Sequence, residues 1–338
     1  MATQVNENKL LRENSIKIVG RLTDAQVTLG NRKDNGHGYI SVDATVVSLI
    51  NGVSNEFKVN FYTNQLTKDG KQSKLYDSYN KLPEMVGKKV EIDGEIRENR
   101  YWSTNLNQLI STQLLSGKFV KGVVESAVDT ATFVIGGFLV KTPVEKRNKK
   151  DEVYRYDVTV GQSNYAGNNM SMITLHINPA QREILSGVES LYSVGDTIQF
   201  TGSLVFKTEV VTVEDENTAF GAPVTKTYTN RQSNFYIEGG SNPISDERAY
   251  SQDVVTALIN AYKAHDVELQ SAASKSAPAS NAAPVSNAAP VVTKRQTSFF
   301  ESSEIYNENK WFWFLLTRRA YSSTSIRKER LLKINGVR

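Results

Sequence analysis

Two stretches of this chain share one pattern: VGKKVEIDGEI at residues 86–96 and VGDTIQFTGSL at residues 194–204. In both, a Val-Gly pair is followed by apolar residues at alternating positions and then by a second glycine. The second stretch begins 108 residues after the first, which is the length of a small domain. The pattern therefore predicts one β-rich fold that occurs twice, and it favours a repeated binding module over a single catalytic pocket.

Further strand-like segments surround both stretches in the same order. Each alternates apolar and polar residues with period two, which is typical of a strand with one buried and one solvent-facing side. The matched pairs are IKIVGRL and TFVIGGFLV, YISVDATVV (39–47) and YRYDVTV (154–160), FKVNFYTNQ (57–65) and MITLHINPAQ (172–181), and NQLISTQLLSG and SNFYIEGGSNP. Five strands in one order, twice, are expected.

Between the third and fourth strands of each repeat, apolar residues recur at helical spacing instead. They are Leu75, Tyr79 and Leu82 before Pro83, and Ile184, Leu185 and Val188 after Pro179. Three strands, a short helix and two strands is the order of the OB-fold, a five-stranded barrel. The predicted fold class is all-β with short helices: two tandem OB-fold five-stranded barrels followed by a helix and a disordered tail.

The expected domain organisation follows from these segments and from changes in composition. The helix is predicted from Val254, Leu258, Ala261 and Tyr262 on one side, with Asp246 and Glu247 in its first turn. The next segment contains SNAAPV twice, which cannot bury a core. The expected units are a first OB-fold at 14–122, a second at 123–243, a helix at 244–269, a flexible Ala/Ser/Pro linker at 270–293 and a basic, aromatic tail at 294–338.

Composition argues against an enzyme. The 338 residues include no cysteine and three histidines, and none of the histidines has the spacing of a metal site. A phosphate-binding loop, an H-E-x-x-H motif and a G-x-S-x-G motif in a credible context are all missing from the sequence. We therefore expect a non-enzymatic protein without a cofactor. The N-terminus has no signal-peptide-like apolar run, so the expected location is the cytoplasm.

Charge differs between the repeats. The net charge of the chain is +4, made up of +4 over residues 14–122, −4 over residues 123–243 and +6 over residues 294–338, with the remainder in the other segments. Lys and Arg that neutralise phosphates release counterions, so the first repeat is the better candidate for binding a polyanion.

With its segments GYISVDATVV, EFKVNFY, LTKDGK and VGKKVEIDGEIRENRYW, and the echo VGDTIQFTGSL, the chain resembles the tandem OB-fold single-stranded DNA-binding proteins of bacteriophages. The resemblance covers roughly residues 14–243. It implies binding of single strands in DNA replication, recombination or repair.

Single-strand binding without base preference needs aromatic rings for stacking and cations along the backbone. The predicted single-stranded DNA-binding residues are Tyr39, Lys58, Tyr62, Arg97, Arg100, Tyr101 and Trp102 in the first repeat, and Lys146, Arg147 and Lys149 in the second. The alternative for the tyrosines is that they only cover the mouth of the barrel.

The predicted function is a single-stranded DNA-binding protein that coats and protects single strands during replication or recombination. Replication or recombination enzymes are candidate partners through the C-terminal region, and no membrane span is expected because the apolar part of the tail is too short. The alternative is a non-catalytic structural or adaptor protein, for example virion-associated, whose barrels bind protein.

Overall fold

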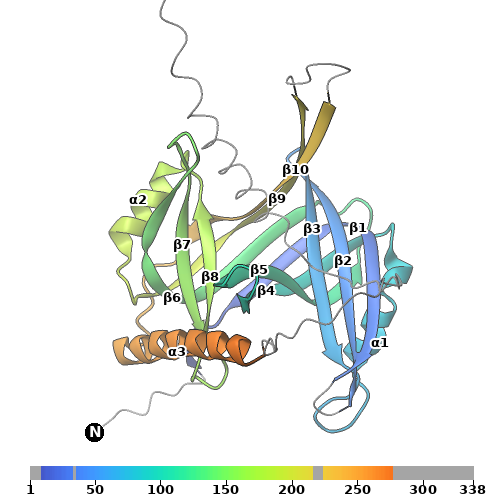
Figure 1. Cartoon of the computed structure of the whole chain (residues 1–338), viewed down its shortest axis with the longest axis horizontal. Coiled ribbons are helices and arrows are strands. Elements are labelled where there is room, and N and C mark those ends of the chain that lie inside the picture. Colours follow the sequence, from blue (N-terminus) through green and yellow to red (C-terminus); the bar gives the residue numbers. More distant parts are fainter. Residues whose placement is uncertain (1–8, 33–35, 216–223, 277–338) are drawn as a thin grey trace, which may run out of the picture. The chain divides into compact units, whose positions relative to one another are not determined.

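The computed structural model describes residues 9–32, 36–215 and 224–276, and these described residues belong to one compact unit (Figure 1). The first repeat contains β1 (Asn14–Asn31), β2 (Gly38–Ile50), β3 (Val53–Asn64), α1 (Lys74–Asn80), the 3₁₀ turn η2 (Leu82–Met85), β4 (Lys89–Ser103) and β5 (Gln108–Gly122). The second contains β6 (Thr130–Arg147), β7 (Val153–Ser163), β8 (Met170–Ile177), α2 (Arg182–Leu191), β9 (Thr197–Asp215) and β10 (Val224–Gly240), and α3 (Gln252–Ser276) follows.

Each repeat closes into a five-stranded barrel. The strands of the first pair in the order β1-β2-β3-β5-β4 and back to β1, and those of the second in the order β6-β7-β8-β10-β9 and back to β6. The third and fifth strands pair in parallel and the other neighbours are antiparallel. This confirms the predicted all-β fold class with OB-fold barrels. How the chain divides into domains stays a prediction.

The two glycines of the repeated pattern have different structural roles. Gly87 and Gly195 open the turn before β4 and β9 with φ of +86° and +95°, a conformation that other residues rarely adopt. At Gly94 and Gly202 the backbone packs too closely for a side chain. A Cβ at Gly94 would lie 2.2 Å from the Ser116 carbonyl oxygen, and one at Gly202 1.9 Å from that of Tyr236.

These roles predict unequal costs for the same substitution. Gly94→Ala should lower the free energy of unfolding by about 2–3 kcal/mol, because a backbone oxygen must move. Gly87→Ala should cost only about 1 kcal/mol, because its turn has open space and only the positive φ is unfavourable. Urea unfolding of both variants measures the difference, and equal losses would contradict this account of the pattern.

The barrels are joined by a direct strand pairing. β1 pairs antiparallel with β6 from Asn14 opposite Ile135 to Val19 opposite Thr130, so all ten strands form one hydrogen-bonded sheet. Ile16 lies opposite Phe133 in this pairing. The two residues are also equivalent, because Ile16 pairs with Gly94 in its barrel as Phe133 pairs with Gly202. The barrels are therefore related by an approximate two-fold axis between Ile16 and Phe133.

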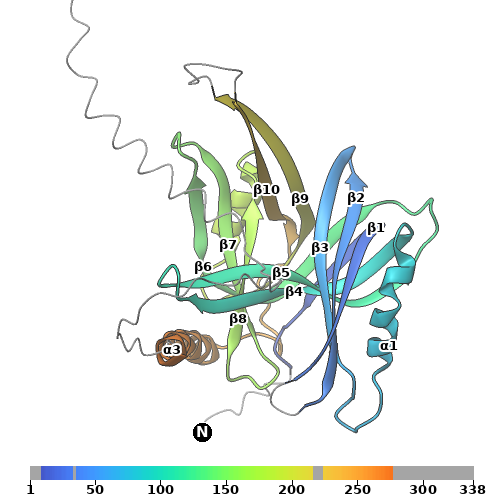
Figure 2. The ribbon, with the colours of Figure 1, turned by 45° about the vertical axis from the view of Figure 1, so that its right-hand side comes forward.

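Each barrel also extends a long hairpin onto the other. The β4–β5 hairpin reaches β8, where the Gln113 side chain donates to the Thr174 carbonyl at 2.9 Å and accepts from the Thr174 amide at 2.7 Å. The β9–β10 hairpin reaches β3, where the Phe206 amide donates to Asn55 Oδ1 at 3.0 Å. Figures 1 and 2 both show the two hairpins crossing between the barrels.

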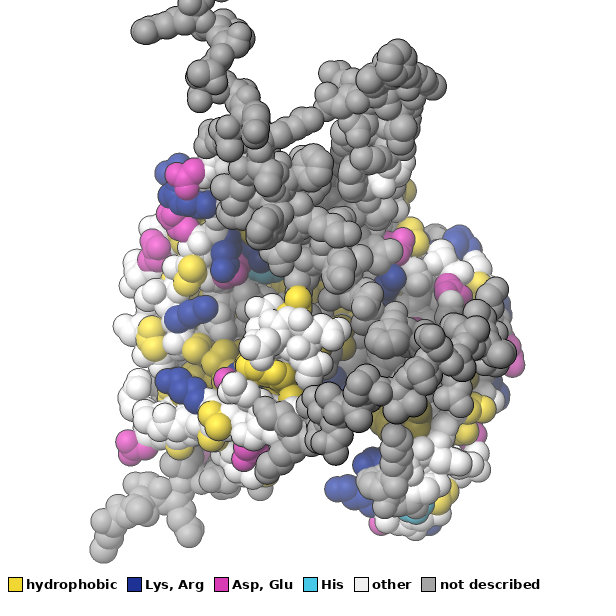
Figure 3. Space-filling model, in the orientation of Figure 1, with side chains coloured by type: hydrophobic (Ala, Val, Ile, Leu, Met, Phe, Trp, Pro, Cys, Tyr) yellow, Lys and Arg dark blue, Asp and Glu magenta, His cyan; other side chains and the backbone are white. Residues whose placement is uncertain are grey.

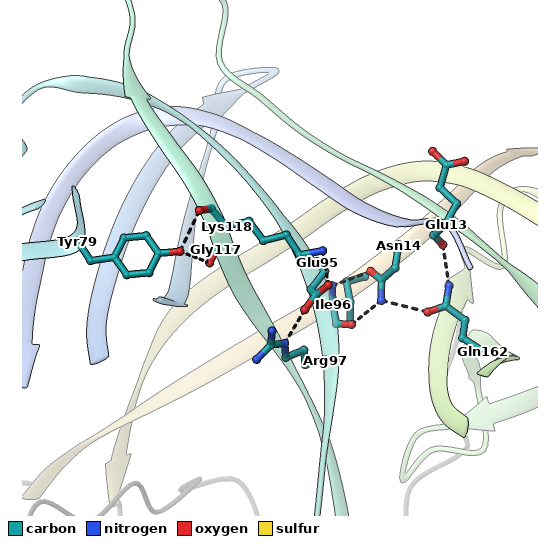
Figure 4. Close-up of polar contacts among 9 residues, drawn as sticks. All are labelled: Glu13, Asn14, Tyr79, Glu95, Ile96, Arg97, Gly117, Lys118 and Gln162. Atoms are coloured by element: carbon teal, nitrogen blue, oxygen red, sulfur yellow. Dashed lines mark hydrogen bonds and ion pairs between the residues drawn. The ribbon is translucent and has the colours of Figure 1, made fainter. Parts of the chain in front are cut away.

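A polar contact near the axis strengthens the junction. The Asn14 side chain accepts from the Ile96 amide at 2.9 Å and donates to the Ile96 carbonyl at 2.8 Å and to Gln162 Oε1 at 3.1 Å (Figure 4). Gln162 in turn donates to the Glu13 and Gly136 carbonyls, both at 2.6 Å. Buried backbone and side-chain groups of both barrels are thus satisfied by one another.

Helix α3 packs on the outer face of the second barrel and also contacts β4 of the β4–β5 hairpin. Tyr250, Val255, Leu258 and Tyr262 form a buried cluster with residues of β6 and β8, namely Phe138 and Met170, and with Leu10 and Leu11. The Tyr250 ring lies 5.0 Å from that of Phe138. A Cβ at Gly161 of β7 would lie 2.5 Å from the Phe138 ring, so this glycine leaves the space in which the ring lies.

The ends of α3 differ from the sequence prediction. The helix begins at Gln252 and not near Asp246, because Asp246 accepts from the Arg248 amide and guanidinium in a local turn and the Tyr250 amide donates to Thr197 Oγ1 of β9. It ends at Ser276 and runs past residue 270, where the linker was expected to begin. Alanines in that segment favour helix. The predicted linker beyond residue 276 and the tail lie outside the described residues.

Candidate nucleic-acid interface

The outer face of β2 and β3 corresponds to the face that commonly binds oligonucleotides in OB-folds. Two predicted residues meet there: the rings of Tyr39 and Tyr62 lie 5.5 Å apart with an interplanar angle of 33°. The Tyr39 ring also lies against Gly30 of β1. Tyr62 is 43% exposed and Tyr39 is half-buried, so one broad aromatic surface is open to solvent.

Strand register brings two of the predicted cations of the first barrel, Lys58 and Arg97, into one row. Exposed Lys58 and Leu114 immediately precede Val59 and Leu115, which are paired across β3 and β5. Leu114 lies opposite Arg97 of β4. Since alternate residues share a face, these three side chains cross the outer surface from β3 to β4. Tyr62 lies further along β3, four residues from Lys58, and its partner Tyr39 is on β2.

Arg97 takes part in an ion-pair cluster. Its Nε donates to Glu95 at 2.6 Å, and Lys118 Nζ approaches the same carboxylate at 2.5 Å (Figure 4). Burial alone would raise the pKa of Glu95, but the hydrogen bonds from Lys118 and Arg97 lower it below its ordinary value. Glu95 is thus a carboxylate that orients the guanidinium, which remains 56% exposed. Close by, the Tyr79 hydroxyl of α1 donates to the Lys118 carbonyl at 2.9 Å.

The run Arg97 to Ser103 does not present all its side chains together, because it lies within β4 and alternates. Arg97 and Tyr101 are on one side, and Tyr101 is 42% exposed there. Arg100 and Trp102 point to the opposite side. Trp102 is half-buried.

Arg100 is held by α3 and is not available as an exposed cation. It forms an ion pair with Asp266, its guanidinium lies 3.5 Å from the centre of the Tyr262 ring, and its side chain is only 10% exposed. Its neighbour Glu98 accepts from the Tyr262 hydroxyl and from the Met172 amide of β8. Arg100 therefore docks the helix to the hairpin, which the sequence prediction missed because the partners are about 160 residues away.

This arrangement predicts a structural role for Arg100. Arg100→Ala should lower the free energy of unfolding by about 2–3 kcal/mol, less than the 3–5 expected for a fully buried pair because Asp266 is 32% exposed. Arg147→Ala is the matched control; its pair with Glu145 is half exposed on both sides, so the change should be under about 1 kcal/mol. Urea unfolding tests both, and equal effects would rule out the docking role.

The three predicted cations of the second barrel lie at the β6–β7 hairpin, where Arg147 and Lys149 are exposed and Lys146 is half-buried. Arg147 is paired with Glu145 at 2.7 Å and with Asp151 at 3.7 Å, and Lys146 lies 3.7 Å from Asp157. Lys149 is exposed in the turn. Their positive charge is offset locally by carboxylates, as the mixed Lys/Arg and Asp/Glu colours over this barrel in Figure 3 also show.

The second barrel's counterpart of the β2–β3 face is largely closed. Helix α3 covers one part, and the β4–β5 hairpin covers the β8 edge. Further along this face, Asp157 and His176 are 7% and 4% exposed. His176 Nδ1 accepts from the Phe235 amide at 3.0 Å, and Asp157 pairs with Arg155 at 2.9 Å. Burial, and then the Arg155 charge, lower the pKa of His176 from 6.5 to about 3.

His176 predicts a pH dependence of stability. In the unfolded chain it binds a proton below about pH 6.5, whereas the folded protein resists protonation down to about pH 3. Its contribution to stability is therefore lost as the pH falls from 6.5 towards 3, by up to about 1.4 kcal/mol per pH unit. His176→Gln keeps an acceptor for the Phe235 amide and should flatten the dependence. Urea unfolding at pH 5–7 measures it, and parallel curves would contradict the assignment.

The sequence did not identify Asn60 and Asp43 of the open face as candidate binding residues. Asn60 of β3 donates from Nδ2 to Asp43 Oδ1 of β2 at 2.8 Å and to Ser41 Oγ at 3.1 Å. Alternation in both strands placed them on the solvent side, but no residue pattern marked them as binding groups.

Among the described residues there is no cluster of acidic, His or Cys side chains that could hold a metal ion. No described helix is long and apolar enough to cross a membrane.

Comparison with known proteins gives the family. Residues 12–274 match the YorF family, and the chain belongs to it. No curated protein matches the sequence significantly. The solved structures that are similar to this chain include three with low sequence identity. The wild-type single-stranded DNA binding protein from Thermus aquaticus has 13% identity and a TM-score of 0.44, over 72% of this chain and 97% of that one. A deletion mutant of that protein has 12% identity and a TM-score of 0.41, over 72% of this chain and 98% of that one. A Plasmodium falciparum SSB complex with ssDNA has 10% identity and a TM-score of 0.22, over 33% of this chain and 95% of that one.

Proposed function

We propose that this protein binds single-stranded DNA through the outer face of β2 and β3 and the adjoining part of β4. The observation that carries the proposal is the pairing of half-buried Tyr39 with exposed Tyr62 on the same face as Lys58. Every base has an aromatic face, so rings of this kind bind unpaired strands with little dependence on sequence. A duplex keeps its bases stacked inside, so it offers no free base face to these rings.

The exposed residues define a path for the strand. Tyr62 is four residues from Lys58 along β3, about 13 Å at ~3.3 Å per residue. Arg97 and Tyr101 are separated in the same way along β4, which runs antiparallel to β3. A DNA strand that crosses the row of Lys58, Leu114 and Arg97 thus meets Tyr62 at one end of the path and Tyr101 at the other. Bases stack at the ends of this path, and phosphates contact the cations at its centre.

The first barrel provides the main site in this proposal because its face is open. Lys146, Arg147 and Lys149 of the second barrel are secondary phosphate contacts, weakened by their acidic neighbours. Trp102 and Arg100 lie on the other side of the hairpin and are not on the path. The proposed setting is the cytoplasm, where the protein protects single strands and presents them to replication or recombination enzymes, without catalysis of its own.

Two substitutions test the proposal separately. Tyr62→Ala should weaken binding of a fluorescent oligonucleotide by about 1–3 kcal/mol, the usual loss of one stacking ring. Lys58→Ala should weaken binding less, and should reduce the slope of log K against log salt concentration by about 0.7, since it removes one phosphate contact. Fluorescence anisotropy over a series of salt concentrations measures both quantities.

Each control makes the same type of substitution at a position outside the proposed binding face. Tyr165→Ala removes a ring that is 90% exposed at the β7–β8 turn, and Lys17→Ala removes a β1 cation already 3.0 Å from Glu91. Both should bind like the unmodified protein. If the intact protein does not bind the oligonucleotide at moderate salt, single-strand binding is wrong and the adaptor alternative takes its place.

A further inference from the structure

The centre of the open face has an acidic group that a purely phosphate-binding surface would not need. Asp43 lies on β2 directly opposite Asn60 and projects from the same side as the tyrosine pair. Its Oδ1 accepts from Asn60 Nδ2 at 2.8 Å, which fixes the orientation of the carboxylate. The described part of the chain places no Lys or Arg in an ion pair with Asp43. A carboxylate beside the tyrosine pair repels phosphates and accepts hydrogen bonds from donors.

The equivalent position in the second barrel is different. Asp157 lies opposite His176 as Asp43 lies opposite Asn60. There the carboxylate is neutralised by Arg155 at 2.9 Å and approached by Lys146 at 3.7 Å, and it is almost completely buried. One position of the fold is thus a filled ion cluster in one barrel and a half-buried acceptor, open at the binding face, in the other.

We propose that Asp43, oriented by Asn60, reads the Watson–Crick edge of a base stacked on the Tyr39–Tyr62 pair and disfavours thymine. This inference rests on the proposed single-strand binding. A carboxylate accepts from the exocyclic amino group of cytosine or adenine and from the paired donors of guanine. Thymine offers one N–H between two carbonyl oxygens, which the carboxylate repels. The single strand leaves these edges free to be read.

The test compares two oligonucleotides that differ only in this edge. Binding of dC15 and dT15 is measured by fluorescence anisotropy at one salt concentration for the intact protein and for Asp43→Asn. In the variant, the Asn60 donor should hold the new amide oxygen, so that the amide nitrogen faces the base. The group that faces the base thus changes from a carboxylate oxygen, which accepts a hydrogen bond, to an amide nitrogen, which donates one. The ratio of dC15 to dT15 affinity should fall by about tenfold, the size expected for one hydrogen bond to a charged group.

Asp93→Asn is the control, because it removes the same charge from β4, a strand that does not pair with β2, at a position 3.8 Å from Lys17. It should leave the ratio unchanged. If both oligonucleotides bind and Asp43→Asn also leaves the ratio unchanged, the inference is overturned while single-strand binding stands. If neither oligonucleotide binds to the intact protein, both proposals fail together.

Discussion

The pairing of β1 with β6 is the constraint on which the rest of the structure depends. Backbone hydrogen bonds continue from one barrel into the other across Ile16 and Phe133, so the relative orientation of the barrels is set by a strand register and not by a linker. A register shift by one residue would turn every side chain of the strand to the other face. The approximate two-fold axis follows, and with it the reciprocal reach of the β4–β5 and β9–β10 hairpins.

The two barrels share one framework, but their outer faces differ because a few outward-facing residues differ. Phe138, Met170 and Met172 of the second barrel are apolar and contact the α3 cluster. Strand pairing makes Phe138 equivalent to Arg21, which is paired with Glu125 on the first barrel. An amphipathic helix buries its apolar side only where the sheet offers apolar surface. Helix α3 therefore packs on the second barrel and not on the equivalent surface around Arg21 of the first barrel.

Sequence periodicity could predict the barrels because strand alternation and the glycine pattern are local signals. The strands extend beyond the expected bounds, since the hairpin ends are stabilised by the other barrel. Tyr39, Tyr62, Lys58 and Arg97 were placed on the solvent side by the same alternation, as the structure has them. Arg100 could not be assigned from its neighbours, because its burial comes from Tyr262 and Asp266 far along the chain.

The equivalent acids Asp43 and Asp157 show what a repeated fold allows. The aspartate recurs opposite a polar residue in both barrels, so the position itself tolerates a carboxylate. Its surroundings decide the consequence. Where Arg155 is adjacent and the face is covered, the carboxylate is neutralised in a structural cluster. Where Asn60 is the adjacent donor and the face is open, its remaining acceptor capacity stays available for a ligand. Stabilising the assembly and contacting a ligand can thus be divided between two copies of one barrel.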